Sequence, residues 1–208
     1  MGTNCDVSLR QFTEYVQARG PERSTVVTKQ IAQAAAPYHP GKDFYRRFLL
    51  AVRQGRAMNL DREVVTRAVE HASAHQTRVY AELARGWLEV VDQFTNTYLH
   101  KQKTGRWRLG DMAVRVTPHL LLEHQDGGIE AVLLYLKQDE LAPEVAEVML
   151  WQMRQAGPEL HSPDGVSPTV VDVRRAVVYR PTRDDVEFSA WMLSEAAAYR
   201  SMWGLLAA

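Results

Sequence analysis

Two histidines, His71 and His75, lie four residues apart in a stretch with helical periodicity. This spacing places two imidazoles on one face of a helix, where they can share one metal ion. No glutamate follows His71, so the zinc-protease motif is absent and a third ligand would have to come from elsewhere. We therefore interpret this pair as surface histidines, and predict that the pair holds no structural metal.

A second chemically distinctive stretch is a basic segment that encloses one indole. Lysine and arginine bind phosphate, and an indole can stack on a nucleobase. This makes the segment the best local candidate in the chain for nucleic-acid binding. The residues concerned are Lys101, Lys103, Arg106, Trp107 and Arg108. A polar connection between a helix and a strand has the same composition, so both interpretations stand.

A row of arginines accompanies the amphipathic stretch that contains Phe44, Phe48 and Val52. The row consists of Arg46, Arg47, Arg53 and Arg56. A solvated helix face usually has this pattern, and only occasionally does such a row form a binding surface.

The other candidate functional residues lie in the stretch 113–137, whose fold must position them. Two apolar, strand-forming runs meet at Asp126, Gly127 and Gly128, where glycine permits the positive φ of a tight hairpin turn. The stretch therefore predicts a β-meander. A further strand pair is predicted over 169–180, because β-branched residues cluster there.

Helices are predicted around these strands. Apolar residues at helical spacing mark helices over 9–18, 21–34 and 44–55, and a long helix over about 59–97 with a break hidden inside. After the meander, Pro143 opens another helix, and a last helix carries Trp191 and Trp203. The fold class is therefore α+β, with an N-terminal helical extension over residues 1–60 and the main body over 61–208.

The order of these elements resembles the core of the PD-(D/E)XK, or restriction-endonuclease-like, nuclease superfamily, particularly its RecB-type members. The resemblance is carried by Val116-Thr-Pro-His-Leu, by Leu134-Tyr-Leu-Lys137, and by the pattern of helix, three-stranded meander, helix, strand pair and helix. It covers roughly the last 130 residues, a normal length for one domain. It implies a divalent metal held by acidic residues, which activates water for attack on a phosphodiester.

The family's site residues match this sequence only in part. His119 follows Pro118 where the family has an aspartate, Tyr135 occupies the second acidic position, and Lys137 matches the family lysine. Glu123 and Glu130 are candidates for displaced acids. Because magnesium prefers oxygen ligands, the usual nuclease metal would be poorly held, and a metal cofactor is expected only if the nuclease alternative holds.

The composition of the chain limits its possible partners and its location in the cell. The 208 residues contain 25 basic and 25 acidic side chains, so no overall field attracts nucleic acid or a membrane. Cys5 is the single cysteine, which excludes an internal disulfide. Without an apolar run of membrane-spanning length, we expect a cytoplasmic protein with no membrane partner.

Three functions are compatible with these observations. The first is a non-catalytic nuclease-fold protein that binds nucleic acid weakly, or binds a protein partner. The second is a metal-dependent nuclease with displaced ligands among His119, Glu123, Glu130 and Lys137. The third is a self-associating structural protein, in which aromatic residues such as Trp151 or Trp203 form the contact between copies.

Overall fold

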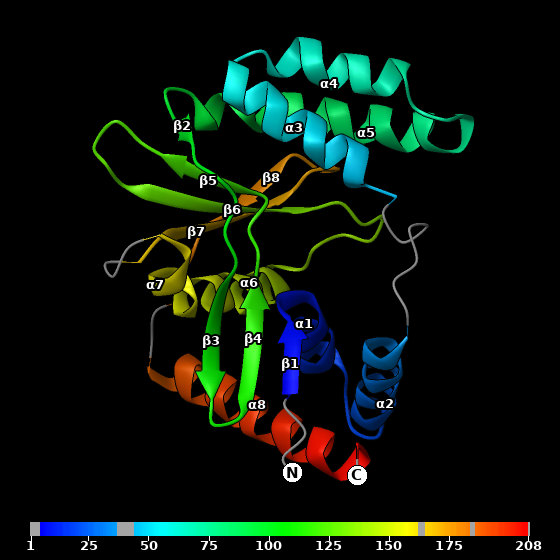
Figure 1. Cartoon of the computed structure of the whole chain (residues 1–208), viewed down its shortest axis with the longest axis vertical. Helices are drawn as coiled ribbons and strands as arrows, with labels where there is room; N and C mark the ends of the chain where they lie inside the picture. Colours follow the sequence, from blue (N-terminus) through cyan, green and yellow to red (C-terminus); the bar gives the residue numbers. More distant parts are fainter. Residues whose placement is uncertain (1–4, 37–43, 162–164, 184–185, 208) are drawn as a thin grey trace.

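A five-stranded mixed sheet forms the centre of the computed structural model, which describes residues 5–36, 44–161, 165–183 and 186–207 (Figure 1). The helices are α1 (Leu9–Gln17), α2 (Glu22–Ala35), α3 (Arg46–Met58), α4 (Asp61–Glu70), α5 (Ala74–Val90), the 3-10 helix η2 (Val91–Phe94), α6 (Pro143–Gln155), α7 (Gly157–Leu160) and α8 (Val186–Leu206). The strands are β1 (Cys5–Ser8), β2 (Tyr98–Leu99), β3 (Gly105–Leu109), β4 (Met112–Val116), β5 (Leu120–Glu123), β6 (Ile129–Tyr135), β7 (Ser167–Asp172) and β8 (Val177–Tyr179). The fold class is α+β, as predicted.

The central sheet has the strand order β2-β5-β6-β7-β8. Strands β5 and β6 form the predicted hairpin, and Gly127 at its turn has a φ of +83°. Strand β7 lies parallel to β6 after the crossover helix α6, and β8 returns antiparallel. This confirms the predicted strand pair, whose turn places Ala176 at a φ of +54° in the absence of glycine.

The predicted meander is wrong in one respect, because its first run is divided between two sheets. Strand β4 belongs to a separate three-stranded sheet, in which it pairs with β3 and with β1. Pro118 lies between β4 and β5 and has no backbone N–H to continue a ladder. The hairpin at Gly110, whose φ is +61°, gives β4 a local partner in β3. The described part of the N-terminal segment is also not purely helical, since β1 precedes α1.

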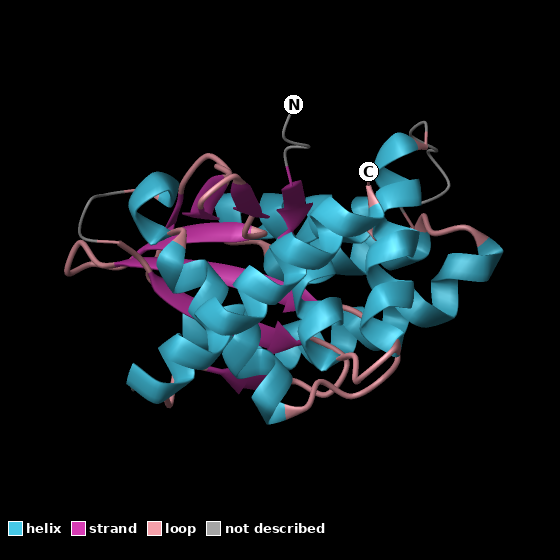
Figure 2. Cartoon of the chain, turned by 90° about the horizontal axis from the view of Figure 1, so that it is seen from below, coloured by secondary structure: helices cyan, strands magenta, loops and turns pink. Residues whose placement is uncertain are grey.

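Two hydrophobic clusters lie on opposite faces of the central sheet. Successive side chains of a strand point to opposite faces of the sheet. Leu121 and Ala131 therefore belong to the cluster that contains α1, α6 and α8, and Leu122 and Val132 belong to the cluster that contains α3 and α5. In Figure 1, α3, α4 and α5 therefore lie above the sheet and α6 and α1 below it. Figure 2, seen from the side of α8, shows helices in front of most strands.

The long predicted helix does contain its break. Helix α4 ends at Glu70 and α5 begins at Ala74, so His71 caps the end of one helix while His75 lies on the next. Helix α4 begins at Asp61, and Asn59 ends α3 with a φ of +55°. Helix α3 itself continues past Gly55, where a Cβ would lie 2.8 Å from the Cα of Asp61. The glycine permits the close approach of α3 to α4.

Among the described residues, every helix is too short or too polar to cross a membrane.

Candidate functional site

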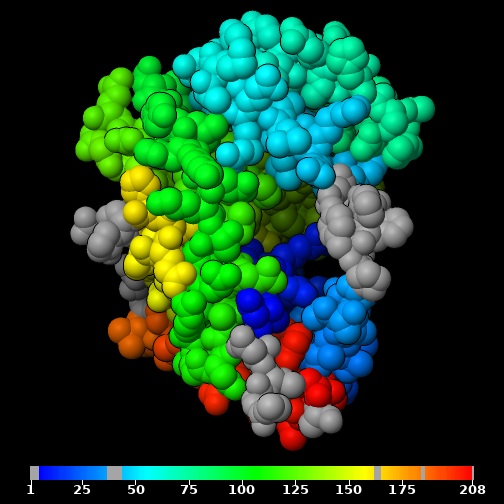
Figure 3. All heavy atoms as spheres, in the orientation of Figure 1, coloured from blue at the N-terminus to red at the C-terminus, as the bar shows by residue number. Residues whose placement is uncertain are grey.

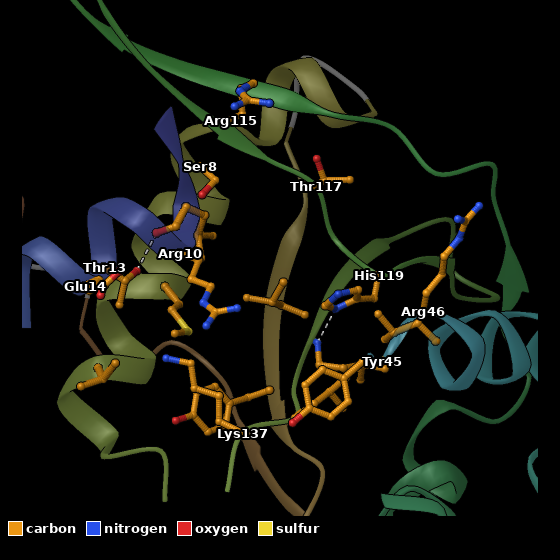
Figure 4. Close-up of a pocket in the computed structure, with 18 of the residues that line it drawn as sticks. Ser8, Arg10, Thr13, Glu14, Tyr45, Arg46, Arg115, Thr117, His119 and Lys137 are labelled. Atoms are coloured by element: carbon orange, nitrogen blue, oxygen red, sulfur yellow. Dashed lines mark hydrogen bonds between the residues drawn. The ribbon is translucent and has the colours of Figure 1, made fainter. Parts of the chain in front are cut away.

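The structure brings His119, Tyr135 and Lys137 to the wall of one cavity of about 660 Å³ (Figure 4). The cavity lies between α1 and α3, and its other walls are the connection from β4 to β5, the end of β6 and the start of α6. Figure 3 shows the surface hollowed between the cyan α3 and the blue α1. Its volume lies in the range of about 300–1,000 Å³ that is usual for ligand sites.

The charge of the cavity is predominantly positive. Its described lining includes five basic side chains and two acidic ones. These are Arg10, Arg46, Arg53, Arg115 and Lys137 on the basic side, and Glu14 and Glu140 on the acidic side. In a chain without net charge, this is a concentrated local excess of cations.

Arg10 and Lys137 carry the least compensated of these charges. Neither forms a hydrogen bond or an ion pair with any residue that the structure describes. Partial burial lowers the pKa of Lys137, and the nearby Arg10 lowers it further, while Glu14 and Asp139 act in the opposite direction. Two neighbouring cations that disfavour one another would be stabilised by an anion between them.

Two other cations are partly engaged. Arg115 donates through Nε to Oδ1 of Asp6 at 2.9 Å. Arg53 donates through Nη1 to the carbonyl oxygen of His119 at 2.6 Å, and burial lowers the pKa of Arg53. These bonds hold both guanidinium groups at the wall of the cavity while leaving further N–H donors on each.

Three helices begin at the cavity. The residues that precede their first turns, Ser8 for α1, Tyr45 for α3 and Ala142 for α6, all line it. The first N–H groups of a helix have no partner inside the helix, and the helix dipole makes this end positive. At α3 and α6 the preceding residue, Tyr45 or Ala142, forms no side-chain bond to these groups. The backbone therefore adds to the positive potential of the cavity.

His119 occupies a fixed orientation in this wall. Its Nδ1 accepts a hydrogen bond of 2.8 Å from the backbone N–H of Leu134. Burial lowers the pKa of His119 to about 4, and the charge of Arg53 contributes. The ring is thus neutral at pH 7, and its single proton is on Nε2. A metal ion at Nε2 would require loss of that proton or of the bond to Leu134.

Tyr135 stays protonated. Burial raises the pKa of its hydroxyl, and the carboxylates of Asp139 and Asp172 raise it further. The residue at the second expected acidic position is therefore a neutral hydroxyl, which can donate a hydrogen bond to an anion.

The two candidate displaced acids, Glu123 and Glu130, lie outside this cavity. Glu123 is four residues beyond His119, about 13 Å along the strand direction. Its carboxylate bonds His100 Nε2 at 2.7 Å. Glu130 is buried at the same end of the hairpin, where Thr169 and His124 bond its carboxylate. Neither residue lines the cavity.

The basic segment is divided between two environments. Lys101 and Lys103 are exposed on either side of Gln102, which lines the cavity. Trp107 is buried against Phe12 and Trp151 in the core, so the prediction that its indole stacks on a base is wrong.

Both arginines of the segment contact the same carboxylate. Arg108 forms an ion pair with Glu159, and the backbone N–H of Arg106 donates to it. Alternation along β3 explains the burial of Trp107, because every second side chain faces the core.

The remaining predicted features do not form sites. His71 follows the last residue of α4 and His75 lies in α5, and within the described ranges no three His, Cys, Asp or Glu side chains are grouped so as to hold a metal ion. Trp151 and Trp203 are buried, so they cannot form the contact between copies that the sequence suggested.

Sequence reasoning missed Arg10 and Glu14 and gave Arg53 no role. Arg10 and Glu14 are separated by four residues on the polar face of α1, a pattern shared by most solvated helices, so no signal distinguished them. Arg53 belonged to the noted arginine row, but only the packing of α3 beside the start of β5 gives it a function.

No protein-family model matches this sequence, and no curated protein is significantly similar to it.

Proposed function

We propose that this chain is a non-catalytic binding module with a nuclease-like core, and that its cavity binds the phosphate backbone of nucleic acid. The observation that carries the proposal is the pair Arg10 and Lys137, two cations that face one cavity without a counter-charge bonded to either in the described chain. A phosphate group is the natural partner of such a pair.

Three features of the fold favour the nuclease-like core. A hairpin, a crossover helix and a parallel third strand follow one another as β5, β6, α6 and β7. His119, Tyr135 and Lys137, which stand at the family's site positions, line the same cavity although His119 precedes β5 and the other two lie at the end of β6 and just after it. A final strand pair and the helix α8 complete the order.

The same positions favour binding over hydrolysis. Metal-assisted cleavage needs oxygen ligands beside the scissile phosphate. Here a neutral imidazole and a neutral phenol stand at the two acidic positions, and the spare acids Glu123 and Glu130 are bonded elsewhere. The cavity therefore presents mainly hydrogen-bond donors and positive charges, with Glu14 and Glu140 as its two acidic side chains in the described lining.

Nucleic acid is favoured over a single small anion because the cations come from separate elements. Arg115 is on β4, Arg10 on α1, Arg53 on α3 and Lys137 follows β6. A ligand with several phosphates along a chain can contact more than one of them, and the tyrosines Tyr45 and Tyr135 offer aromatic surface. With zero net charge on the chain, we expect weak and salt-sensitive affinity.

The test is an anisotropy titration of labelled single-stranded and double-stranded oligonucleotides at several salt concentrations. Replacing Arg10 and Lys137 together by Ala should weaken binding. If two phosphate contacts are lost, the slope of log K against log salt should become shallower by about 1.4 for a single strand. The charge-matched control replaces the exposed Lys29 and Arg85, which lie outside the cavity, and should change little.

Absence of binding by the native chain at low salt would refute the proposal. Equal binding by the double variant would place any interaction outside the cavity, and a protein partner would then be the better function.

A further inference from the structure

The wall of the cavity contains one hydrogen-bond donor whose direction is set by the backbone. Strand β5 begins at Leu120, so the N–H of Leu134 on the neighbouring strand has no backbone acceptor opposite it. The imidazole of His119 takes that place, and its Nδ1 accepts the bond at 2.8 Å. A backbone N–H can only donate, so Nδ1 must present a lone pair.

The opposite nitrogen of the ring is consequently a donor. A neutral imidazole carries one proton, and with Nδ1 acting as an acceptor this proton is on Nε2. Within the described part of the chain Nε2 has no hydrogen-bond partner. His119 is half-buried and lines the cavity, which leaves this N–H available to a ligand there.

The backbone around His119 is also held in place. The residue's own N–H donates to the carbonyl oxygen of Val132 at 2.8 Å, and its carbonyl oxygen accepts from Arg53. Three bonds thus fix the residue before any ligand binds. A preorganised donor avoids much of the entropy that a flexible side chain loses on binding.

We infer that His119 determines the ligand class of this cavity, because its fixed Nε2–H donates to a phosphate oxygen while Arg10 and Lys137 supply the charge. The inference rests on the proposed function and assigns a binding role to one residue of that site. A donor in this position favours a hydrogen-bond acceptor and disfavours a metal ion or a cationic group.

Two substitutions separate the two nitrogens of the ring. In His119→Asn, the side-chain oxygen can accept from Leu134 as Nδ1 does, but the Nε2 donor is lost. In His119→Gln, the side-chain amide nitrogen reaches the Nε2 position, but the acceptor for Leu134 is lost. The first variant tests binding and the second tests structure.

The probe is a labelled single-stranded oligonucleotide at low salt, with urea unfolding measured on the same proteins. We expect His119→Asn to keep its stability and to bind about 3- to 10-fold more weakly, the usual worth of one neutral hydrogen bond. We expect His119→Gln to lose stability, and to bind within about twofold of the native chain under conditions where it is folded.

A second measurement does not depend on the ligand. Long-range ¹⁵N–¹H spectra of the native chain at pH 7 should show His119 protonated on Nε2. Protonation on Nδ1, or native affinity in His119→Asn, would overturn the inference while leaving the proposed function intact. If the native chain bound no oligonucleotide, both this inference and the proposed function would be refuted.

Discussion

Replacement of Asp61 by Ala should destabilise the protein strongly, because it would leave a buried guanidinium without its counter-charge. Asp61 is 6% exposed and Arg56 is 8% exposed. Nε of Arg56 lies 2.9 and 2.8 Å from the two carboxylate oxygens, and the indole N–H of Trp87 donates to the same carboxylate at 3.2 Å. Arg56 also donates to the carbonyl oxygen of Phe94 at 2.7 Å.

The expected magnitude follows from this burial. Removing one partner of a buried ion pair costs about 3–5 kcal/mol. The whole free energy of unfolding of such a chain is of the order of 5–15 kcal/mol. At about 2–4 °C per kcal/mol for a protein of this size, the melting temperature should fall by about 6–20 °C.

Urea unfolding followed by tryptophan fluorescence is a suitable assay, since Trp87 lies against the carboxylate. The matched control is the double variant Arg56→Met with Asp61→Leu. It removes both charges and should be far less destabilised, because an apolar pair of similar volume often replaces a buried ion pair at little cost. A loss below about 1 kcal/mol in Asp61→Ala, or equal losses in both variants, would refute this reasoning.

Three further predictions concern activity, pH and packing. Purified protein incubated with plasmid, linear DNA and RNA in magnesium should leave them intact, and cleavage that Lys137→Ala abolishes would instead establish the nuclease alternative. The free energy of unfolding should fall as the pH drops from about 6.5 to 4. In this range the unfolded chain binds a proton on His119, whereas the folded chain, in which the pKa of His119 is about 4, does not. The urea midpoint of His119→Asn should therefore fall less over the same pH range. Gly86→Ala should cost at least about 3 kcal/mol, because its Cβ would lie 1.7 Å from the carbonyl oxygen of Val173. In the same unfolding measurement Gly204→Ala, which meets no atom within 4 Å, should be neutral or slightly stabilising, and similar losses in both would contradict the packing argument.

Local signals in the sequence were sufficient for the α+β class and most elements. Helical periodicity located α1 and α6, and the glycines at 127 and 128 located the β5–β6 hairpin. Such signals depend on neighbours in the chain, so they are readable without tertiary information. The pairing of β4 with β1 could not be predicted from such signals. The two strands are separated by about a hundred residues, and a four-residue strand carries little periodicity of its own.

Part of the candidate site could also be predicted from the sequence. The resemblance pointed to His119, Tyr135 and Lys137, which the fold brings to one cavity. The resemblance gave no indication of the tautomer of His119. The tautomer is set by the backbone N–H of Leu134, which donates to Nδ1 of His119 because β5 starts too late to offer it a backbone acceptor. The exposure of Trp107 was misjudged because a basic segment and an amphipathic strand share the same alternating pattern.

The connection between β4 and β5 has a mechanical consequence. It joins the small sheet to the central one, and the cavity beside it is lined by α1, which belongs to one hydrophobic cluster, and by α3, which belongs to the other. A ligand that contacts Arg10 and Arg53 would link these two packing units without itself belonging to either. Occupancy would then restrain shear between them, so hydrogen exchange should slow in both helices together when the cavity is filled.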